Sequence, residues 1–244
     1  MRFSRSLWAL SLIAVFGAAH AEVTATLTGA SDFDFRGISQ NAHKPTPQGS
    51  VDLASDSGWY LGAWGSRIDL GARSPGLEVD FSGGFRKKLP SGVGYELGSV
   101  YYTYHAPNAH EFDYLEVYTG ATFRWAAARL YFSPKFGGNA GREMLHGDVS
   151  AFYLTTEAAY PLRANFSLTA HAGYSFGNYW DKQRDGNYGR PYFDWSAGLG
   201  YTRRRLTFIL KWVDGSALTE SNTTMRDVLS TRAHAVFAVS TTFP

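Results

Sequence analysis

The chain has no cysteine among its 244 residues, so neither disulfide bonds nor thiolate metal sites can hold it together. It also lacks an excess of one charge: its 23 basic and 21 acidic residues argue against nucleic acid as a partner. Beyond the N-terminus, no apolar run approaches the ~20 residues that a membrane-spanning helix needs. No Pro-rich, Ser-rich or low-complexity linker divides the chain.

Catalytic signatures are missing as well, because the sequence contains no G-x-S-x-G, H-E-x-x-H or P-loop pattern. The seven histidines show no metal-ligand spacing, so we expect neither a metal nor a cofactor. One arrangement keeps a lipid hydrolase as an alternative: His105 and His110 flank a predicted outer loop, and Ser99 lies on the same predicted strand as His105. The sequence otherwise predicts that the protein is not an enzyme.

The N-terminus has the three parts of a secretory signal peptide. Arg2 and Arg5 form a basic region, residues 7–18 are apolar, and Ala19-His20-Ala21 fits a cleavage site. We therefore predict a signal peptide over residues 1–21 and a mature domain over residues 22–244. Cleavage would remove two of the 23 basic residues and none of the 21 acidic ones, which leaves an exported, neutral chain.

Aromatic residues and glycine are plentiful, with 7 Trp, 15 Tyr, 17 Phe and 26 Gly. From residue 23 to residue 35, apolar residues such as Val23 and Phe33 alternate with polar residues such as Thr24 and Asp32. This alternation is typical of a strand with two unlike faces. Such patterns along the chain predict twelve strands: 23–35, 48–55, 59–70, 77–87, 93–105, 111–125, 128–136, 148–160, 166–179, 191–203, 205–214 and 230–243. The pattern is less clean in four of them, where both faces carry apolar residues: 48–55, 59–70, 128–136 and 148–160.

The connections between these strands alternate in length. Every second one is a tight turn: 56–58, 88–92, 126–127, 161–165 and 204. Bacterial outer-membrane barrels have an even number of strands, short periplasmic turns and longer extracellular loops. Most of the predicted strands also reach the roughly 9–11 residues that a tilted strand needs to cross a bilayer. The sequence therefore predicts an all-β fold, an up-and-down antiparallel transmembrane β-barrel of about twelve strands in the bacterial outer membrane.

Alternation alone does not say which face points inward, and a soluble lipocalin-like barrel with an apolar interior is the alternative. Aromatic residues near the strand ends favour the membrane barrel, because aromatic girdles mark membrane interfaces. On the apolar face these residues are Tyr95, Trp125, Tyr174, Trp195, Tyr201 and Trp212. The polar face would then line a watery lumen, and outer-membrane lipid would be the partner of the apolar face.

Two segments resemble the opening signature of a proteobacterial family, known as the Gcw_chp or TorF-type porins. They are SDFDFRGISQ at residues 31–40 and SGWYLGAWGSRIDL at residues 57–70. The resemblance implies an outer-membrane porin, but it assigns neither a substrate nor catalytic residues. Barrel chains usually end on an aromatic residue that the barrel-assembly machinery recognises, so we expect that machinery to be a partner. Here Pro244 follows the aromatic Phe243.

Charged residues on the predicted polar face would set the field and the bore of the lumen. We predict that eight of them line it: Asp32, Asp34, Arg36, Glu78, Asp80, Glu96, Glu116 and Arg124. Acids outnumber bases on this face, which favours cations. We thus expect passive diffusion of small hydrophilic solutes or ions, with a weak preference for cations. Alternatively, these charges pair across the lumen and close it, leaving a structural or adhesive barrel that acts through loops 137–147, 180–190 and 215–229.

Overall fold

The computed structural model describes residues 21–69, 76–105, 109–182, 191–216 and 233–244. The predicted signal peptide lies almost entirely outside the described residues. No helix in the described part of the chain is both long and apolar enough to cross a membrane.

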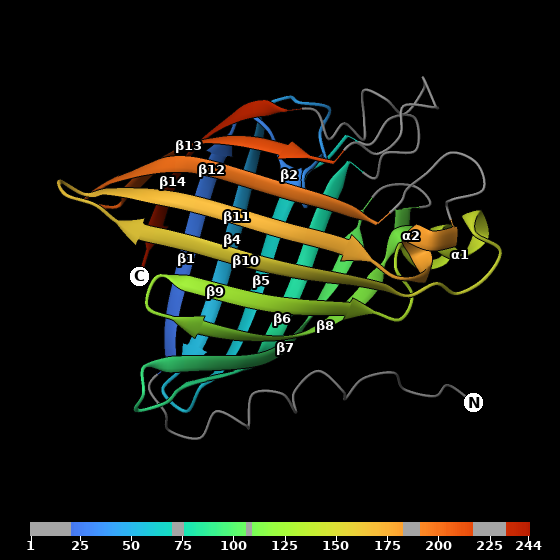
Figure 1. Cartoon of the computed structure of the whole chain (residues 1–244), viewed down its shortest axis with the longest axis horizontal. Helices are drawn as coiled ribbons and strands as arrows, with labels where there is room; N and C mark the ends of the chain where they lie inside the picture. The colour runs from blue at the N-terminus through green and yellow to red at the C-terminus, as the bar shows by residue number, and fades with distance from the viewer. Residues whose placement is uncertain (1–20, 70–75, 106–108, 183–190, 217–232) are drawn as a thin grey trace, which may run out of the picture.

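Twelve antiparallel strands close into one barrel, in which each strand pairs with its neighbours along the chain and β1 pairs with both β14 and β4 (Figure 1). The strands are β1 (Ala21–Ala30), β4 (Thr46–Ser55), β5 (Trp59–Arg67), β6 (Leu77–Lys88), β7 (Val93–Tyr104), β8 (Tyr114–Phe123), β9 (Ala126–Ser133), β10 (Ala151–Pro161), β11 (Phe166–Phe176), β12 (Tyr192–Arg203), β13 (Leu206–Gly215) and β14 (His234–Phe243). The predicted fold and strand number are confirmed. Because the ring is closed, no strand edge is left for lipid to face.

Within the described parts of the longer connections lie five short elements. They are the two-residue strands β2 (Asp34–Phe35) and β3 (Ile38–Ser39), the 3-10 helix η2 (Ala109–Phe112), and the helices α1 (Gly138–Met144) and α2 (Asn178–Lys182). The helices α1 and α2 lie at one end of the barrel, and the C-terminus lies at the other (Figure 1).

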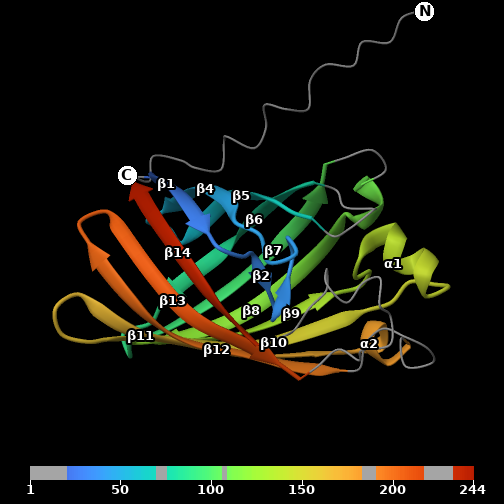
Figure 2. The same ribbon diagram turned by 90° about the horizontal axis from the view of Figure 1, so that it is seen from above.

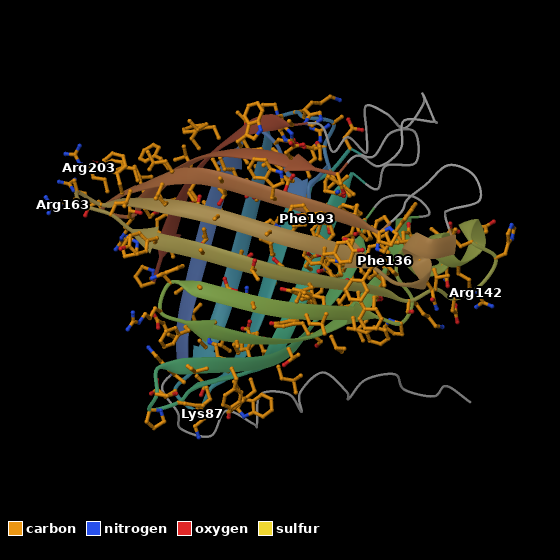
Figure 3. The ribbon with its side chains drawn as sticks, in the orientation of Figure 1. Lys87, Phe136, Arg142, Arg163, Phe193 and Arg203 are labelled. Atoms are coloured by element: carbon orange, nitrogen blue, oxygen red, sulfur yellow. The ribbon has the colours of Figure 1, made fainter. Side chains whose placement is uncertain are left out.

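Tight turns join the strands at the end that holds the C-terminus. Residues 124–125 and 204–205, for example, are two-residue turns, in which Arg124 and Arg204 adopt positive φ values of 54° and 58°. The predicted alternation of short and long connections is therefore confirmed. Basic side chains such as Lys87, Arg163 and Arg203 lie at this turn end (Figure 3), where they can meet anionic lipid headgroups.

The apolar face of the strands is the outer face of the barrel. Leu97, Leu27 and Leu210 are 64%, 59% and 56% exposed, although each belongs to a regular strand. Five of the six predicted girdle aromatics are exposed on the same face: Tyr95, Trp125, Tyr174, Trp195 and Trp212. An apolar exterior on a closed barrel is the arrangement that lipid stabilises, and it is the opposite of the arrangement in a soluble lipocalin-like barrel.

The first strand is shorter than predicted, because β1 ends at Ala30 and not at residue 35. Residues 31–45 form an inner hairpin instead, which carries β2 and β3 and lies within the ring of strands (Figure 2). Its turn is made by Arg36 and Gly37, with φ values of 54° and 78°. The alternation of residues 31–35 is real, but Phe33 packs against Trp64 inside the barrel, with ring centroids 5.0 Å apart, and does not face lipid.

Candidate functional site

The inner hairpin leaves the wall at β1 and reaches strands on the far side of the ring. Its turn contacts β8, β10 and β12, through Glu116, Tyr153 and Tyr192 respectively. In the order of strands around the barrel, β8 lies nearly opposite β1. The hairpin therefore crosses the bore, and the contacts it makes there define the candidate functional site.

Arg36 and Glu116 form the central contact of this site. The guanidinium donates two hydrogen bonds to the carboxylate, from Nη1 to Oε1 over 3.1 Å and from Nη2 to Oε2 over 2.6 Å. The hydroxyl of Tyr102 donates a third to Oε2, over 3.0 Å. The side chains of Arg36 and Glu116 are only 7% and 1% exposed. A two-point, charge-assisted contact away from water fixes both position and orientation of the hairpin turn.

Aromatic rings surround the same guanidinium. Its central carbon lies 4.2 Å from the ring centroid of Tyr153, 4.7 Å from that of Phe35 and 5.4 Å from that of Tyr131. These distances suit attraction between a cation and the electron-rich ring faces. The hydroxyl of Tyr192 donates a hydrogen bond to the backbone carbonyl of Arg36, over 3.0 Å. The turn is thus held through its side chain and its backbone alike.

Gly37 follows Arg36 where the hairpin closely approaches β12 of the wall. A Cβ atom built on Gly37 would lie 2.6 Å from the Cβ of Asp194 on β12, which no side chain tolerates. Asp194 is 1% exposed and is held by His171 Nε2, at 2.7 Å, and by the hydroxyl of Tyr153. Only glycine combines this approach with the positive φ that the turn requires.

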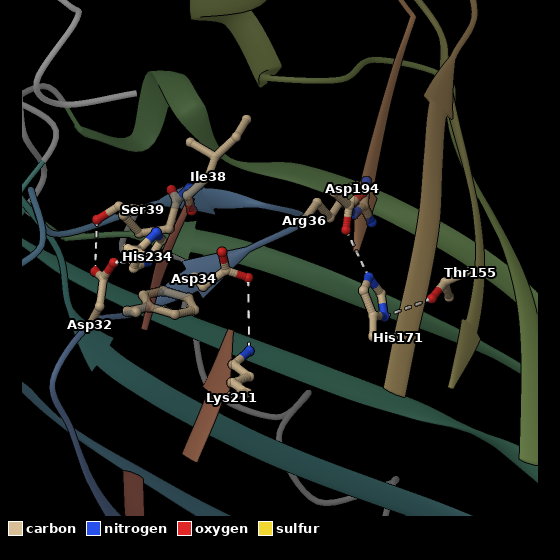
Figure 4. A network of polar contacts seen from close by, with 12 residues as sticks. Asp32, Asp34, Arg36, Ile38, Ser39, Thr155, His171, Asp194, Lys211 and His234 are labelled. Atoms are coloured by element: carbon tan, nitrogen blue, oxygen red, sulfur yellow. Dashed lines mark hydrogen bonds and ion pairs between the residues drawn. The ribbon is translucent and has the colours of Figure 1, made fainter. Parts of the chain in front are cut away.

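A row of Thr155, His171 and Asp194 lies under the hairpin turn (Figure 4). Thr155 Oγ1 is 3.3 Å from His171 Nδ1, and His171 Nε2 is 2.7 Å from Asp194. The order hydroxyl, imidazole, carboxylate resembles a catalytic triad. However, Thr155 is only 4% exposed, so its hydroxyl is closed to a substrate. The row is best explained as a polar support for Asp194 and Tyr153.

The hairpin also carries a carboxylate toward β13. Asp34 Oδ1 lies 4.0 Å from the ammonium of Lys211, and Asp34 Oδ2 has no hydrogen-bond partner among the described residues. Burial raises the pKa of Asp34, and the positive charge of Lys211 only partly opposes this effect. Asp34 is therefore the least satisfied charged group of the inner hairpin.

The structure places seven of the eight predicted lumen residues inside the barrel. Asp32, Asp34 and Arg36 lie there on the inner hairpin and not, as predicted, on a wall strand. The others come from β6, β7 and β8: Glu78, Asp80, Glu96 and Glu116. Of these, Glu96 forms an ion pair with Arg129, which also contacts Glu157, and Glu116 forms the pair with Arg36.

The eighth prediction, Arg124, was wrong. Strand β8 ends at Phe123, so Arg124 lies in the exposed turn before β9, with φ 54°. Its guanidinium lies over the ring of Phe123, 5.2 Å from the centroid. The predicted strand, 111–125, runs two residues past the end of β8, into a turn whose residues no longer obey the two-residue period of a strand.

Several interior tyrosines were not among the predicted lumen residues. Tyr102 and Tyr114 stack with centroids 4.5 Å apart, and the hydroxyls of Tyr60 and Tyr118 are hydrogen-bonded to each other. These residues share the polar parity of their strands, which was the available indication. Tyrosine suits such a wall because its ring packs while its hydroxyl finds a polar partner.

The residues considered for a hydrolase do not assemble. Ser99 and His105 are six residues apart on an extended segment, which separates them by about 20 Å. His105 Nε2 instead lies 2.9 Å from Thr103 Oγ1. The side chain of His110 lies outside the described residues.

A closed barrel with an apolar exterior, a polar interior and an inserted segment is the architecture of outer-membrane porins. The chain belongs to the Gcw_chp family, described as bacterial protein of unknown function, whose model matches residues 15–243. The resemblance found in the sequence is thereby confirmed. No curated protein matches the chain in sequence.

Solved porin structures are similar in fold. A NanC porin superposes with a TM-score of 0.57 and 11% identity, covering 90% of this chain and 99% of that one. A KdgM porin superposes with a TM-score of 0.54 and 8% identity, covering 91% and 98%. At these identities the likeness shows the fold alone. The predicted outer-membrane location agrees with this fold and with the apolar exterior.

Proposed function

We propose that the protein is an outer-membrane channel for passive diffusion of small hydrophilic solutes or ions, with the inner hairpin as its constriction. The observation that supports this most is the hairpin itself: it crosses a polar bore and is fixed to the far wall by Arg36 and Glu116. As a constriction, the hairpin would narrow the barrel, and solute would pass beside it. The related KdgM fold, solved in complex with disordered oligogalacturonate, supports a polar solute as the cargo class.

We further propose a weak preference for cations. Inside the barrel, Arg36 and Arg129 are each bound by carboxylates, so their charges are already compensated. Arg124, a base that the sequence placed in the lumen, lies in an exposed turn instead. It therefore does not offset the acidic residues of the lumen. Asp52 is exposed, and its described hydrogen bond comes from the Ser50 hydroxyl and not from a cation. Uncompensated carboxylates along a water path raise the local concentration of cations.

Conductance across a planar bilayer under a salt gradient tests both proposals. The mature protein should give stepwise openings and a reversal potential of cation-favouring sign. Asp52→Asn should move that potential toward zero. Asp214→Asn is the matched control, because Asp214 shares the outward parity of Trp212 and makes the same change of charge outside the lumen. Equal shifts in both variants would contradict a selectivity set by the lumen.

A closed barrel with a structural or adhesive role is the second candidate. The burial of Arg36 and Glu116, at 7% and 1% exposure, favours it, because such a seal could exclude water as well as solute. A correctly folded protein that leaves the bilayer silent would support this candidate. Openings that appear only after Arg36→Ala would show that the barrel is built to be closed by its hairpin.

We propose no catalytic role for this protein. The separation of Ser99 from His105 and the burial of Thr155 support that view. Incubation of the folded protein with phospholipid micelles should release no fatty acid. Release that disappears on His105→Ala would overturn the proposal.

A further inference from the structure

A second cluster lies at the base of the inner hairpin, away from its turn. Asp32 precedes β2 and His43 follows β3, so the two residues mark the two roots of the hairpin. His234 is the first residue of β14, on the adjacent wall. The sequence separates these three residues by up to about two hundred positions, so no local spacing could reveal the cluster. Figure 4 shows His234 and Ser39 beside Asp32.

Both imidazoles converge on a single carboxylate oxygen. Asp32 Oδ2 lies 2.8 Å from Nδ1 of His43 and 2.9 Å from Nε2 of His234. The two rings are 4.5 Å apart between centroids, at an interplanar angle of 74°. All three potential ligand atoms lie within 4.8 Å of one another, and no other such group occurs among the described residues. Three side chains from separate segments thus aim at one small volume.

The other carboxylate oxygen of Asp32, Oδ1, accepts a hydrogen bond from Ser39. The Ser39 hydroxyl donates to Asp32 Oδ1 over 2.7 Å, and the same hydroxyl oxygen accepts the backbone N–H of His43 over 2.9 Å. Ser39 is fully buried, so this contact does not compete with water. A hydroxyl that orients both a carboxylate and a neighbouring histidine is the kind of outer support that metal ligands receive in proteins.

Two imidazoles and one carboxylate are ligands for zinc and similar borderline transition metals, whereas magnesium and calcium prefer oxygen alone. Ligand atoms around a tetrahedral zinc ion lie about 3.3 Å apart, since each is roughly 2.0–2.2 Å from the metal. The two contacts to Asp32 Oδ2 would therefore lengthen by only about 0.5 Å. Each neutral imidazole can offer the required lone pair by carrying its proton on its other nitrogen.

Exposure is graded across the cluster. The side chains of Asp32 and His234 are 3% and 18% exposed, while that of His43 is 35% exposed. An ion could therefore enter from the His43 side, and a water molecule could occupy a fourth position there. Burial of the other two ligands would protect the bound ion from exchange with solvent.

We propose that Asp32, His43 and His234 form a binding site for a divalent transition metal ion of the zinc class, which joins both roots of the inner hairpin to β14. This site goes beyond the proposed channel, because it would exist whether or not the bore conducts. The bound ion would fix the base of the hairpin to β14, at the end opposite the Arg36 turn.

Calorimetric titration with Zn²⁺ tests the site directly. The mature chain should be prepared without a histidine tag, folded in detergent micelles and checked for heat-modifiable migration on a gel. We expect one saturable Zn²⁺ per chain, and no comparable binding of Mg²⁺ under the same conditions. His43→Ala and His234→Ala should each weaken Zn²⁺ binding at least about tenfold. His105→Ala, a change to an exposed histidine at the same end of the barrel, should leave it unchanged.

Two outcomes would overturn the proposal. One is a folded wild-type protein that binds no Zn²⁺ at a saturable site. The other is a folded His43→Ala/His234→Ala double variant that retains the wild-type affinity, which would place the ion elsewhere. His43 lies outside the barrel strands and is partly exposed, so its replacement should not prevent folding.

Discussion

At the scale of single residues, Arg36 joins the inner hairpin to several strands of the wall. Its guanidinium meets a carboxylate on β8 and aromatic rings on β9 and β10. A buried ion pair of this kind adds little net stability compared with apolar packing, yet removing one partner leaves a charge stranded away from water. The pair therefore specifies where the hairpin lies more than it stabilises the barrel.

Arg36→Ala should destabilise the folded protein by about 3–5 kcal/mol, because Glu116 would keep a buried and unpaired charge. Urea unfolding in lipid, followed by tryptophan fluorescence, measures this loss. The double variant Arg36→Met/Glu116→Leu should recover most of it, since both charges are then gone. A single variant as stable as wild type would show that water already reaches Glu116. Glu116→Gln would also weaken the contact with Arg36, so a change of ion selectivity in that variant would not report on the charge of Glu116 alone.

Gly37→Ala should cost more than the usual penalty for a left-handed alanine, which is about 1–2 kcal/mol. The added methyl would collide with Asp194 at 2.6 Å. Gly76→Ala is the matched control, because Gly76 has a φ of +82° but open space around its Cβ position. The two unfolding free energies should therefore differ, and equal values would mean that the hairpin turn shifts without cost.

At the scale of the elements, alternation located most of the twelve wall strands clearly, because lipid on one side and polar contacts on the other impose a two-residue period. Alternation was weaker for β4, β5, β9 and β10, where both faces carry apolar residues. It was insufficient at the end of β1. Phe33 and Phe35 continue the period into the inner hairpin, where their partners are Trp64 and Tyr102 and not lipid. The short strands of the hairpin have the same two-residue period as the wall strands, so the sequence pattern does not distinguish the two kinds. Their tertiary contacts do.

The same limit explains what the sequence could say about the site. It identified Arg36 and Glu116 as interior charges but could not pair them, since they are 80 positions apart and their alignment depends on the closed ring. The cluster of Asp32, His43 and His234 was invisible for the same reason. Arg124 was misplaced because the alternation continues through Trp125, although the tight turn already begins after Phe123.

The outer face of β13 offers a test of the membrane assignment at this scale. Leu210→Arg places a charge in the middle of the strand and should cost about 2–4 kcal/mol of folding free energy in a phospholipid bilayer. Leu206→Arg, on the same face but beside the turn, should cost only about 0–1 kcal/mol. Equal costs at the two positions would contradict a bilayer that covers the centre of this strand.

At the scale of the whole molecule, the twelve strands form a wall that closes by itself, and the inner hairpin is inserted into it. The wall is complete without the hairpin, because β1 pairs with β4 along its whole length and with β14 from Ala25 to Ala30. The insert depends on the wall for its contacts. Bore size should therefore be adjustable without loss of the barrel.

Replacing residues 33–40 by a short glycine-serine linker should leave the barrel folded and raise its single-channel conductance. The expected reason is the loss of the segment that crosses the bore. Gel migration would verify folding, and planar-bilayer recording would give the conductance. An unchanged conductance in a folded deletion variant would mean that the narrowest point lies elsewhere.

The pairing of Arg36 with Glu116 also has a consequence for the order of assembly. The hairpin directly follows β1 in the chain, yet its binding surface is shared among β8, β10 and β12, which are synthesised much later. Contacts between residues far apart in the sequence form late in folding, because the conformational entropy cost of closing the loop between them must be met first. Until the ring closes, the guanidinium would lack its partner on β8 and would remain in water. The contact between Arg36 and Glu116 should therefore form after barrel closure in a refolding experiment.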